Sequence, residues 1–343
     1  MSARDALRRV LRGQTLGRDE ARELFVAVAQ EEASADDTAV RSALFAALAT
    51  RGESVDELLG AAEALRATER RFEHPFADAV DFSGTGGDAF YTFNVTAAAG
   101  LVAASAGARV ILQGERALAT ACASADLLEA AGLSLDLEPE ASAQVLEEVG
   151  ITFLYTPTYH PVLAATAALR RALGVRTLLD LAAPLAHPAH VSRQVVGVGE
   201  RVRAARVAAA LGELGTERAF VVHGAGGADE LTLAGENLVL PLGAAESASF
   251  DARALALPPS SVGALAGGDR RRNLALLERL LAGENGPICN AVVQNAAAVL
   301  VVAGLARSPG EGAELARAAL RRGHARKTLA RWLETSARLC EAA

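Results

Sequence analysis

The segment Asp81-Phe-Ser-Gly-Thr-Gly-Gly-Asp88 is the most informative part of this sequence for the fold. A short apolar run before it predicts a strand over residues 77–82, and a helix is predicted soon after it, over residues 95–106. Glycines let the backbone approach an anion closely, and a helix start offers free N–H groups at the positive end of its dipole. The strand, turn and helix therefore predict a phosphate-binding unit. A tight glycine turn with Asn94 as the helix N-cap is the alternative that this spacing leaves open.

The residues after this segment repeat the same alternation of short apolar runs and alanine-rich helices. Further strands are predicted over 109–112, 152–155, 218–223 and 237–240, and further helices over 124–131, 139–149 and 195–211. Such alternation is typical of βα units on a mainly parallel sheet, so the fold class is α/β. The spacing G-x-G-x-x-G and the Walker lysine are both absent from the glycine turn, which argues against a dinucleotide or P-loop site.

The first 70 residues have a different pattern. Apolar residues recur at helical spacing from residue 3 onward and predict about four helices, with Ser54 and Glu57 forming a capping box. The charged stretch 69–75 contains a proline and predicts a linker. We therefore expect a small all-helical N-terminal domain over 1–72, joined by helices from 160–185, and a large α/β domain over 73–343.

Composition limits the classes of function. The chain has 343 residues, 51% of them hydrophobic and 22% charged, with a net charge of −7, which favours a folded protein and disfavours nucleic acid as a partner. Three widely spaced cysteines argue against a disulfide framework or a zinc site. No signal peptide is predicted, so a cytoplasmic location is expected. The apolar stretch 291–306 is shorter than the roughly 20 residues of a membrane span and predicts a buried helix.

A second candidate site is the loop His223-Gly-Ala-Gly-Gly-Ala-Asp229-Glu230, which follows the predicted strand 218–223. Magnesium takes a few carboxylates and leaves its other positions to water and phosphate oxygens, so Asp229 and Glu230 predict a Mg²⁺ site next to a phosphate. Solvated surface charge is the alternative for such a pair.

These motifs occur together in one order. Gly84-Thr-Gly-Gly-Asp88, Thr92-Phe-Asn94, Ser124-Ala-Asp126-Leu-Leu-Glu129, Arg170 before Leu173-Gly-Val-Arg176-Thr177, and Asp229-Glu230 resemble the anthranilate phosphoribosyltransferase family over nearly the whole chain. The resemblance implies a helical domain joined to an α/β domain, ligands in the cleft between them, and a homodimer formed through the helical part. It also implies transfer of phosphoribosyl from phosphoribosyl pyrophosphate to the amine of anthranilate, in tryptophan biosynthesis.

The resemblance also implies roles for individual residues. Arg170 would orient the carboxylate of the aromatic acceptor, for which a planar guanidinium is suited. Thr96 stands where the family has a magnesium-binding serine, and it would hold Mg²⁺ together with Asp229 and Glu230. No residue is predicted to act as a covalent nucleophile. The other substrate-binding residues are Gly84, Thr85, Gly86, Gly87, Asp88, Thr92, Asn94, Gly114, Glu115, Arg116 and Ser124.

Several positions depart from the family pattern. The family's Lys-His-Gly-Asn-Arg stretch reads Leu112-Gln-Gly-Glu-Arg116 here, so a lysine is lost and Glu115 brings a carboxylate to the acceptor side. Ala183 replaces a glycine, and Ala119, Thr120 and Ala123 replace two serines and another glycine. Three interpretations follow: drift within an anthranilate enzyme, a paralogue with another acceptor, or a non-catalytic ligand-binding protein of the same fold.

Overall fold

The computed structural model describes residues 1–343 except 31–33, 87–90, 119–120 and 342–343. Its centre is a six-stranded sheet in the order β3-β2-β1-β4-β5-β6. All neighbouring strands are parallel except β5 and β6, which pair antiparallel. The strands are β1 Val80–Gly84, β2 Val110–Gly114, β3 Ile151–Tyr155, β4 Arg193–Gly197, β5 Arg218–His223 and β6 Leu238–Gly243. The predicted α/β class is confirmed.

The order of the strands determines where a ligand can bind. From β1 the chain moves outward to β2 and β3, and it then returns to place β4 on the other side of β1. At such a reversal the connections leave a crevice at the carboxyl ends of the two central strands. The glycine segment begins at the carboxyl end of β1, and Gly84 pairs in register with Gly197, the last residue of β4. The predicted phosphate-binding turn therefore lies at this crevice.

Strand β4 is where the sequence prediction was wrong. A helix was predicted over residues 195–211, whereas residues Arg193–Gly197 form a strand and helix α11 begins only at Arg201. The run from Gln194 to Val198 is fully buried in the centre of the sheet. A parallel strand covered on both faces shows no alternation, so its apolar run merged with the pattern of the next helix.

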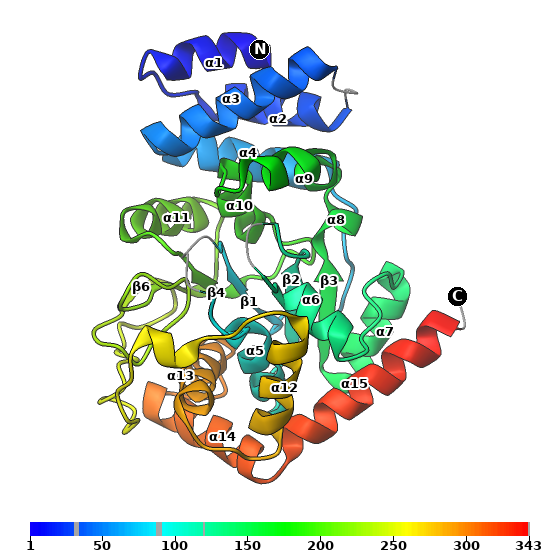
Figure 1. Cartoon of the computed structure of the whole chain (residues 1–343), viewed down its shortest axis with the longest axis vertical. Coiled ribbons are helices and arrows are strands. Elements are labelled where there is room, and N and C mark those ends of the chain that lie inside the picture. Colours follow the sequence, from blue (N-terminus) through cyan, green and yellow to red (C-terminus); the bar gives the residue numbers. More distant parts are fainter. Residues whose placement is uncertain (31–33, 87–90, 119–120, 342–343) are drawn as a thin grey trace.

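Helices cover both faces of the sheet (Figure 1). Helices α5 and α13 pack on one face, and α15 packs on α5 and α7. Helix α11 packs on the other face, between the sheet and the N-terminal helices. Most of α13 is buried, which confirms the prediction of a buried helix there. The bounds are α5 Val95–Ser105, α6 Ser124–Ala130, α7 Pro139–Val149, α8 Thr156–Tyr159, α11 Arg201–Glu213, η2 Val262–Leu265, α12 Arg270–Leu281, α13 Pro287–Val302, α14 Pro309–Arg321 and α15 His324–Glu341.

The N-terminal helices form a separate layer at one end of the molecule (Figure 1). They are α1 Ala3–Leu11, α2 Arg18–Gln30, α3 Ala35–Arg51 and α4 Val55–Thr68, and α9 Pro161–Leu173, α10 Leu178–Ala182 and η1 Ala183–Ala186 pack against them. The predicted capping box is confirmed, because the Ser54 amide donates to Glu57 and the Glu57 amide donates to the Ser54 hydroxyl. Gly60 lets α4 approach α2 closely, since a Cβ atom there would lie 2.3 Å from the carbonyl oxygen of Arg18.

Among the described residues, no helix combines the length and the apolar character that crossing a membrane requires.

Candidate active site

A cavity with a volume of about 280 Å³ opens at the carboxyl ends of the central strands. It lies where the glycine turn after β1, the end of β2, the start of α5, helices α9 and α10 and the loop after β5 meet. Every predicted site residue that the structure describes lines this cavity. They are Gly84, Thr85, Gly86, Thr92, Asn94, Thr96, Gly114, Glu115, Arg116, Ser124, Arg170, Asp229 and Glu230. Gly87 and Asp88 lie outside the described residues.

Glycines hold Asp229 over the ends of β1 and β4. A Cβ atom on Gly84 would lie 2.3 Å from Asp229 Oδ2, and one on Gly197 would lie 1.5 Å from the Asp229 carbonyl oxygen. The amide of Gly86, whose φ is +65°, donates a hydrogen bond of 2.7 Å to Asp229 Oδ2. Side chains at these glycines would displace the carboxylate, so the glycine turn and Asp229 form one structural unit.

The start of α5 faces the same cavity. Asn94 occupies the N-cap position, as the alternative predicted, but its side chain makes no capping hydrogen bond. Its Nδ2 donates to the Cys122 carbonyl at 3.0 Å, and its Oδ1 accepts from Asn273 Nδ2 at 2.8 Å. Val95 and Thr96, in the first turn of α5, line the cavity. A helix start in this position suits an anion.

Asp229 and Glu230 supply oxygen ligands of the type Mg²⁺ prefers. Both line the cavity, and so does Thr96. The described residues contain no group of three or more His, Cys, Asp and Glu side chains suited to hold a metal ion. A pair of carboxylates without further protein ligands fits magnesium that is completed by water and phosphate oxygens rather than a closed protein cage.

Arg176 also lines the cavity, and it was not among the predicted site residues. Its Nη1 donates to Thr85 Oγ1 at 3.0 Å, which brings its positive charge to the glycine turn. Its Nε and Nη2 atoms are buried without a hydrogen-bond partner among the described residues. Burial lowers the pKa of this guanidinium from its ordinary value. The sequence signal was present in Arg176-Thr177, but nothing local showed that Thr85, 91 residues earlier, would contact it.

Arg170 lines the cavity, and both Nη atoms of its guanidinium are hydrogen-bonded within the protein. Nη1 donates to Glu115 Oε1 at 2.6 Å and to Asp180 Oδ1 at 2.8 Å, while Nη2 donates to Glu115 Oε2 at 2.8 Å and to the Leu163 carbonyl at 3.3 Å. Only 1% of the Arg170 side chain is exposed. Burial raises the pKa of Glu115 above its ordinary value, and the bonds to Arg170 oppose that change.

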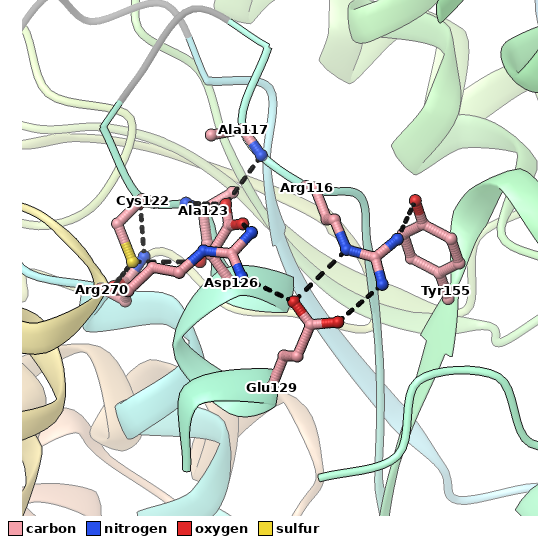
Figure 2. Close-up of polar contacts among 9 residues, drawn as sticks. Arg116, Ala117, Cys122, Ala123, Asp126, Glu129, Tyr155 and Arg270 are labelled. Carbon is pink, nitrogen blue, oxygen red and sulfur yellow. Dashed lines mark hydrogen bonds and ion pairs between the residues drawn. The ribbon is translucent and has the colours of Figure 1, made fainter. Parts of the chain in front are cut away.

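Arg116 lies on another wall of the cavity, paired with an acidic side chain of α6. Its Nη2 donates to Glu129 Oε1 at 2.7 Å and its Nη1 to the Tyr155 hydroxyl at 2.9 Å, as Figure 2 shows. The guanidinium carbon lies 4.8 Å from the centre of the Tyr155 ring. The hydrogen bond from Arg116 lowers the pKa of Glu129 below its ordinary value. Arg116 is thus held in one orientation by its neighbours.

Asp126 accepts hydrogen bonds from the segment that follows Arg116 (Figure 2). Its Oδ2 accepts hydrogen bonds from the amides of Ala117 at 2.8 Å and Ala123 at 2.9 Å, and its Oδ1 pairs with Arg270. Ala117 and Ala123 line the cavity, and the Asp126 side chain is almost completely buried. One carboxylate therefore holds both ends of a cavity wall.

The positions that depart from the family pattern have different surroundings. Leu112, expected to replace a lysine near pyrophosphate, is buried and does not line the cavity, because its side chain packs against Gly100 of α5. Gln113 does line it and donates from Nε2 to the Ala183 carbonyl at 3.2 Å. Ala183 has φ −55°, which any residue adopts. Ala119 and Thr120 lie outside the described residues.

Two buried groups near the glycine turn have raised pKa values. Burial raises the pKa of the Cys122 thiol to about 11, so it is protonated at neutral pH. Asp81, in β1, is completely buried, and desolvation raises its pKa to about 7. Its Oδ2 accepts a hydrogen bond of 2.6 Å from the Ser83 hydroxyl, and it does not line the cavity.

Comparison with known proteins finds relatives of both the N-terminal helical part and the α/β part of the chain. Residues 4–68 match the helical bundle domain of a glycosyl transferase family, and residues 76–326 match the a/b domain of that family. The anthranilate phosphoribosyltransferase of Novosphingobium aromaticivorans is 40% identical over 316 residues, which is 92% of this chain and 94% of that protein. The enzyme of the same name from Rubrobacter xylanophilus is 40% identical and covers 98% of each chain.

Solved structures of anthranilate phosphoribosyltransferases share the fold of this chain. The crystal structure of anthranilate phosphoribosyltransferase from Thermus thermophilus matches with a TM-score of 0.87 and 37% identity, over 97% of this chain and 99% of that one. The Saccharomyces cerevisiae enzyme in complex with PRPP and Mg matches with a TM-score of 0.85 over 97% of each chain, and at 20% identity it supports the fold alone. On these matches, and on a cavity that unites the motifs of the resemblance, this chain belongs to the anthranilate phosphoribosyltransferase family.

Proposed function

We propose that this chain is a magnesium-dependent phosphoribosyltransferase of the anthranilate type. It transfers phosphoribosyl from phosphoribosyl pyrophosphate to an aromatic amine, with anthranilate, the acceptor in its relatives' names, as the reference substrate. The observation that carries the proposal is the meeting of the glycine turn, the start of α5 and Asp229 in one cavity. The Saccharomyces cerevisiae structure in complex with PRPP and Mg supports it through the shared fold.

The donor occupies the side of the cavity formed by the glycine turn. The resemblance assigns its phosphates to Gly84, Gly87, Asp88, Thr92 and Asn94, and Arg176 adds a positive charge beside Thr85. Asp229, Glu230 and Thr96 would hold Mg²⁺, which neutralises part of the pyrophosphate charge when bound.

The reaction needs positioning and charge stabilisation rather than a covalent step. As the bond between the ribose carbon and pyrophosphate breaks, the carbon gains positive charge, and the acceptor amine forms the new bond from the opposite face and then loses a proton. Amides and cations fixed before the reaction stabilise the leaving group without reorganising. The protonated thiol of Cys122 contributes no nucleophile.

The experiment that tests the proposal is calorimetry of phosphoribosyl pyrophosphate binding, with and without Mg²⁺, followed by a steady-state assay with anthranilate. Chelation and the double change Asp229→Ala, Glu230→Ala should each abolish or strongly weaken donor binding. The double change Glu147→Ala, Glu148→Ala is the matched control, since it removes two adjacent exposed carboxylates from α7. Donor affinity that is unchanged by the Asp229 and Glu230 variant would refute the metal assignment. Donor binding without turnover of any aromatic amine would favour the non-catalytic interpretation.

We also propose a cytoplasmic homodimer with a helical domain over 1–72 and an α/β domain over 73–343. The helical residues bury their apolar side chains against α9, α10 and α11, although Leu11 remains 70% exposed. The apolar faces of these helices are therefore mostly covered within one chain, and the dimer is proposed from the resemblance. Sedimentation at micromolar concentration should report two subunits, and a folded monomer would refute this.

A further inference from the structure

The acceptor side of the cavity is recognisable by its polar groups. Among the described residues that line the cavity, the cations are Arg116, Arg170 and Arg176. Arg116 is neutralised by Glu129, and Arg176 lies at the glycine turn on the donor side. Arg170, which the resemblance assigns to the acceptor, lies beside Glu115 and Asp180, so its hydrogen bonds determine what charge the acceptor can carry.

Glu115 occupies the part of Arg170 that a substrate carboxylate would use. The two Nη atoms have four hydrogens, and they donate to both Glu115 oxygens, to Asp180 and to the Leu163 carbonyl. A carboxylate binds a guanidinium best through two parallel hydrogen bonds, and Glu115 already makes them. Nε is buried and has no hydrogen-bond partner among the described residues, but a carboxylate could form two parallel hydrogen bonds with Arg170 only after Glu115 had left.

The local charge adds to this competition. One guanidinium faces the two carboxylates of Glu115 and Asp180, so the formal charge of the trio is −1 when both carboxylates are ionised. Asp180 is itself fixed, because its Oδ2 accepts from the Thr177 amide and hydroxyl, both at 2.7 Å. A second anion at this place would meet repulsion in a partly desolvated site, where it is weakly screened.

Gln113 supplies an independent indication from the same wall. Its Nε2 is identified by the bond to the Ala183 carbonyl, because a carbonyl can only accept. Its Oε1 therefore faces the other way, and it is buried with no donor among the described residues. Because Gln113 lines the cavity, a small shift of its side chain would let this atom accept a hydrogen bond from a ligand. Glu115 and Asp180 add carboxylate oxygens to the same cavity lining.

We infer that the acceptor site of this chain selects an aromatic amine whose second ring substituent is uncharged and donates hydrogen bonds, such as a carboxamide, over one that bears a carboxylate. The inference deepens the proposed phosphoribosyl transfer and rests on it for the amine and the donor. Glu115 is then the residue that determines this specificity, as an internal carboxylate that takes the place of the substrate's.

The test compares two acceptors of nearly equal shape, 2-aminobenzamide and anthranilate. Binding of each to the full chain is measured by calorimetry, and kcat/KM is measured with phosphoribosyl pyrophosphate and Mg²⁺. The wild type should bind and use the amide at least ~10-fold better, the low end of discrimination by a single group. Glu115→Gln should lose or reverse this ratio, whereas Glu115→Asp, which keeps the charge, should retain it. Glu217→Gln, which removes a surface pair with Arg193, is the matched control and should leave the ratio unchanged.

The outcomes distinguish the inferred acceptor specificity from the proposed phosphoribosyl transfer. Tighter binding of anthranilate by the wild type, or binding of neither acceptor, overturns the inference, and this comparison needs no variant to fold. Donor binding and turnover together with a preference for anthranilate overturns the inference but leaves phosphoribosyl transfer intact. A preference for the amide without any donor binding supports the acceptor specificity and overturns the proposed reaction.

Discussion

Replacing Asp126 by alanine should loosen the part of the cavity lining formed by residues 117–118 and 121–123. The Asp126 carboxylate accepts the amides of Ala117 and Ala123, at 2.8 and 2.9 Å, so it joins the two ends of this segment. Arg270 pairs with the other oxygen from a neighbouring helix (Figure 2). In Asp126→Ala both amides lose their charged acceptor, and nothing else described in the structure would replace it.

The expected cost follows from the exposure of the partners. Hydrogen bonds to a charged group contribute about 1.5–3 kcal/mol each when buried, and the two alanines are only half-buried, so water recovers part of the loss. We expect Asp126→Ala to lower the free energy of unfolding by about 2–4 kcal/mol. Arg270→Ala removes the ion pair but keeps both amide bonds, and because Arg270 is 48% exposed its loss should cost only about 0–1 kcal/mol.

Urea unfolding followed by fluorescence of Trp332 measures this difference, since Trp332 is the single tryptophan and is 1% exposed. Amide hydrogen exchange at Ala117 and Ala123 measures the local effect and should be faster in Asp126→Ala than in Arg270→Ala. Equal losses of stability in the two variants, with unchanged exchange at these two amides, would refute the reasoning.

Three further predictions concern other parts of the molecule. Gly60→Ala should destabilise the chain by about 1–3 kcal/mol, because its Cβ would lie 2.3 Å from the Arg18 carbonyl oxygen, and a melting temperature equal to that of the wild type would contradict the close packing of α2 on α4. Asp81 has a pKa raised from 3.8 to about 7 by burial, so its contribution to stability is complete below pH 3.8 and is lost as the pH rises to about 7. The gap corresponds to about 4 kcal/mol, and Asp81→Asn should therefore gain stability relative to the wild type between pH 4 and pH 7, which a flat difference in urea unfolding would disprove. Arg176→Met should weaken binding of phosphoribosyl pyrophosphate by about 10- to 150-fold, the loss of one ionic contact, whereas Arg171→Met, at an exposed neighbour, should not; equal affinities would show that Arg176 does not bind the donor.

The helices, strands and turns that have local sequence signals could be predicted from the sequence alone. Glycines between a strand and a helix predicted the turn at Gly84, helical periodicity predicted the N-terminal domain, and Ser54 with Glu57 predicted a cap that the structure contains. The same local pattern placed the Asp229 loop after a strand, at the edge of the sheet where the glycine turn also lies. Backbone propensity and side-chain spacing carry this information, and both act over a few residues.

Which side chains contact each other, and whether a position faces the cavity or the core, could be seen only in the tertiary structure. Strand β4 escaped prediction because a strand buried on both faces has no periodicity of its own. Leu112 matches a lysine position by sequence but packs against Gly100, and Glu115 neutralises Arg170 although 55 residues separate them. Such pairings arise when distant segments are brought together on the sheet, where burial strengthens a charge pair. Neither local propensity nor the order of motifs encodes that approach, so the charge of the acceptor site became visible only in the folded chain.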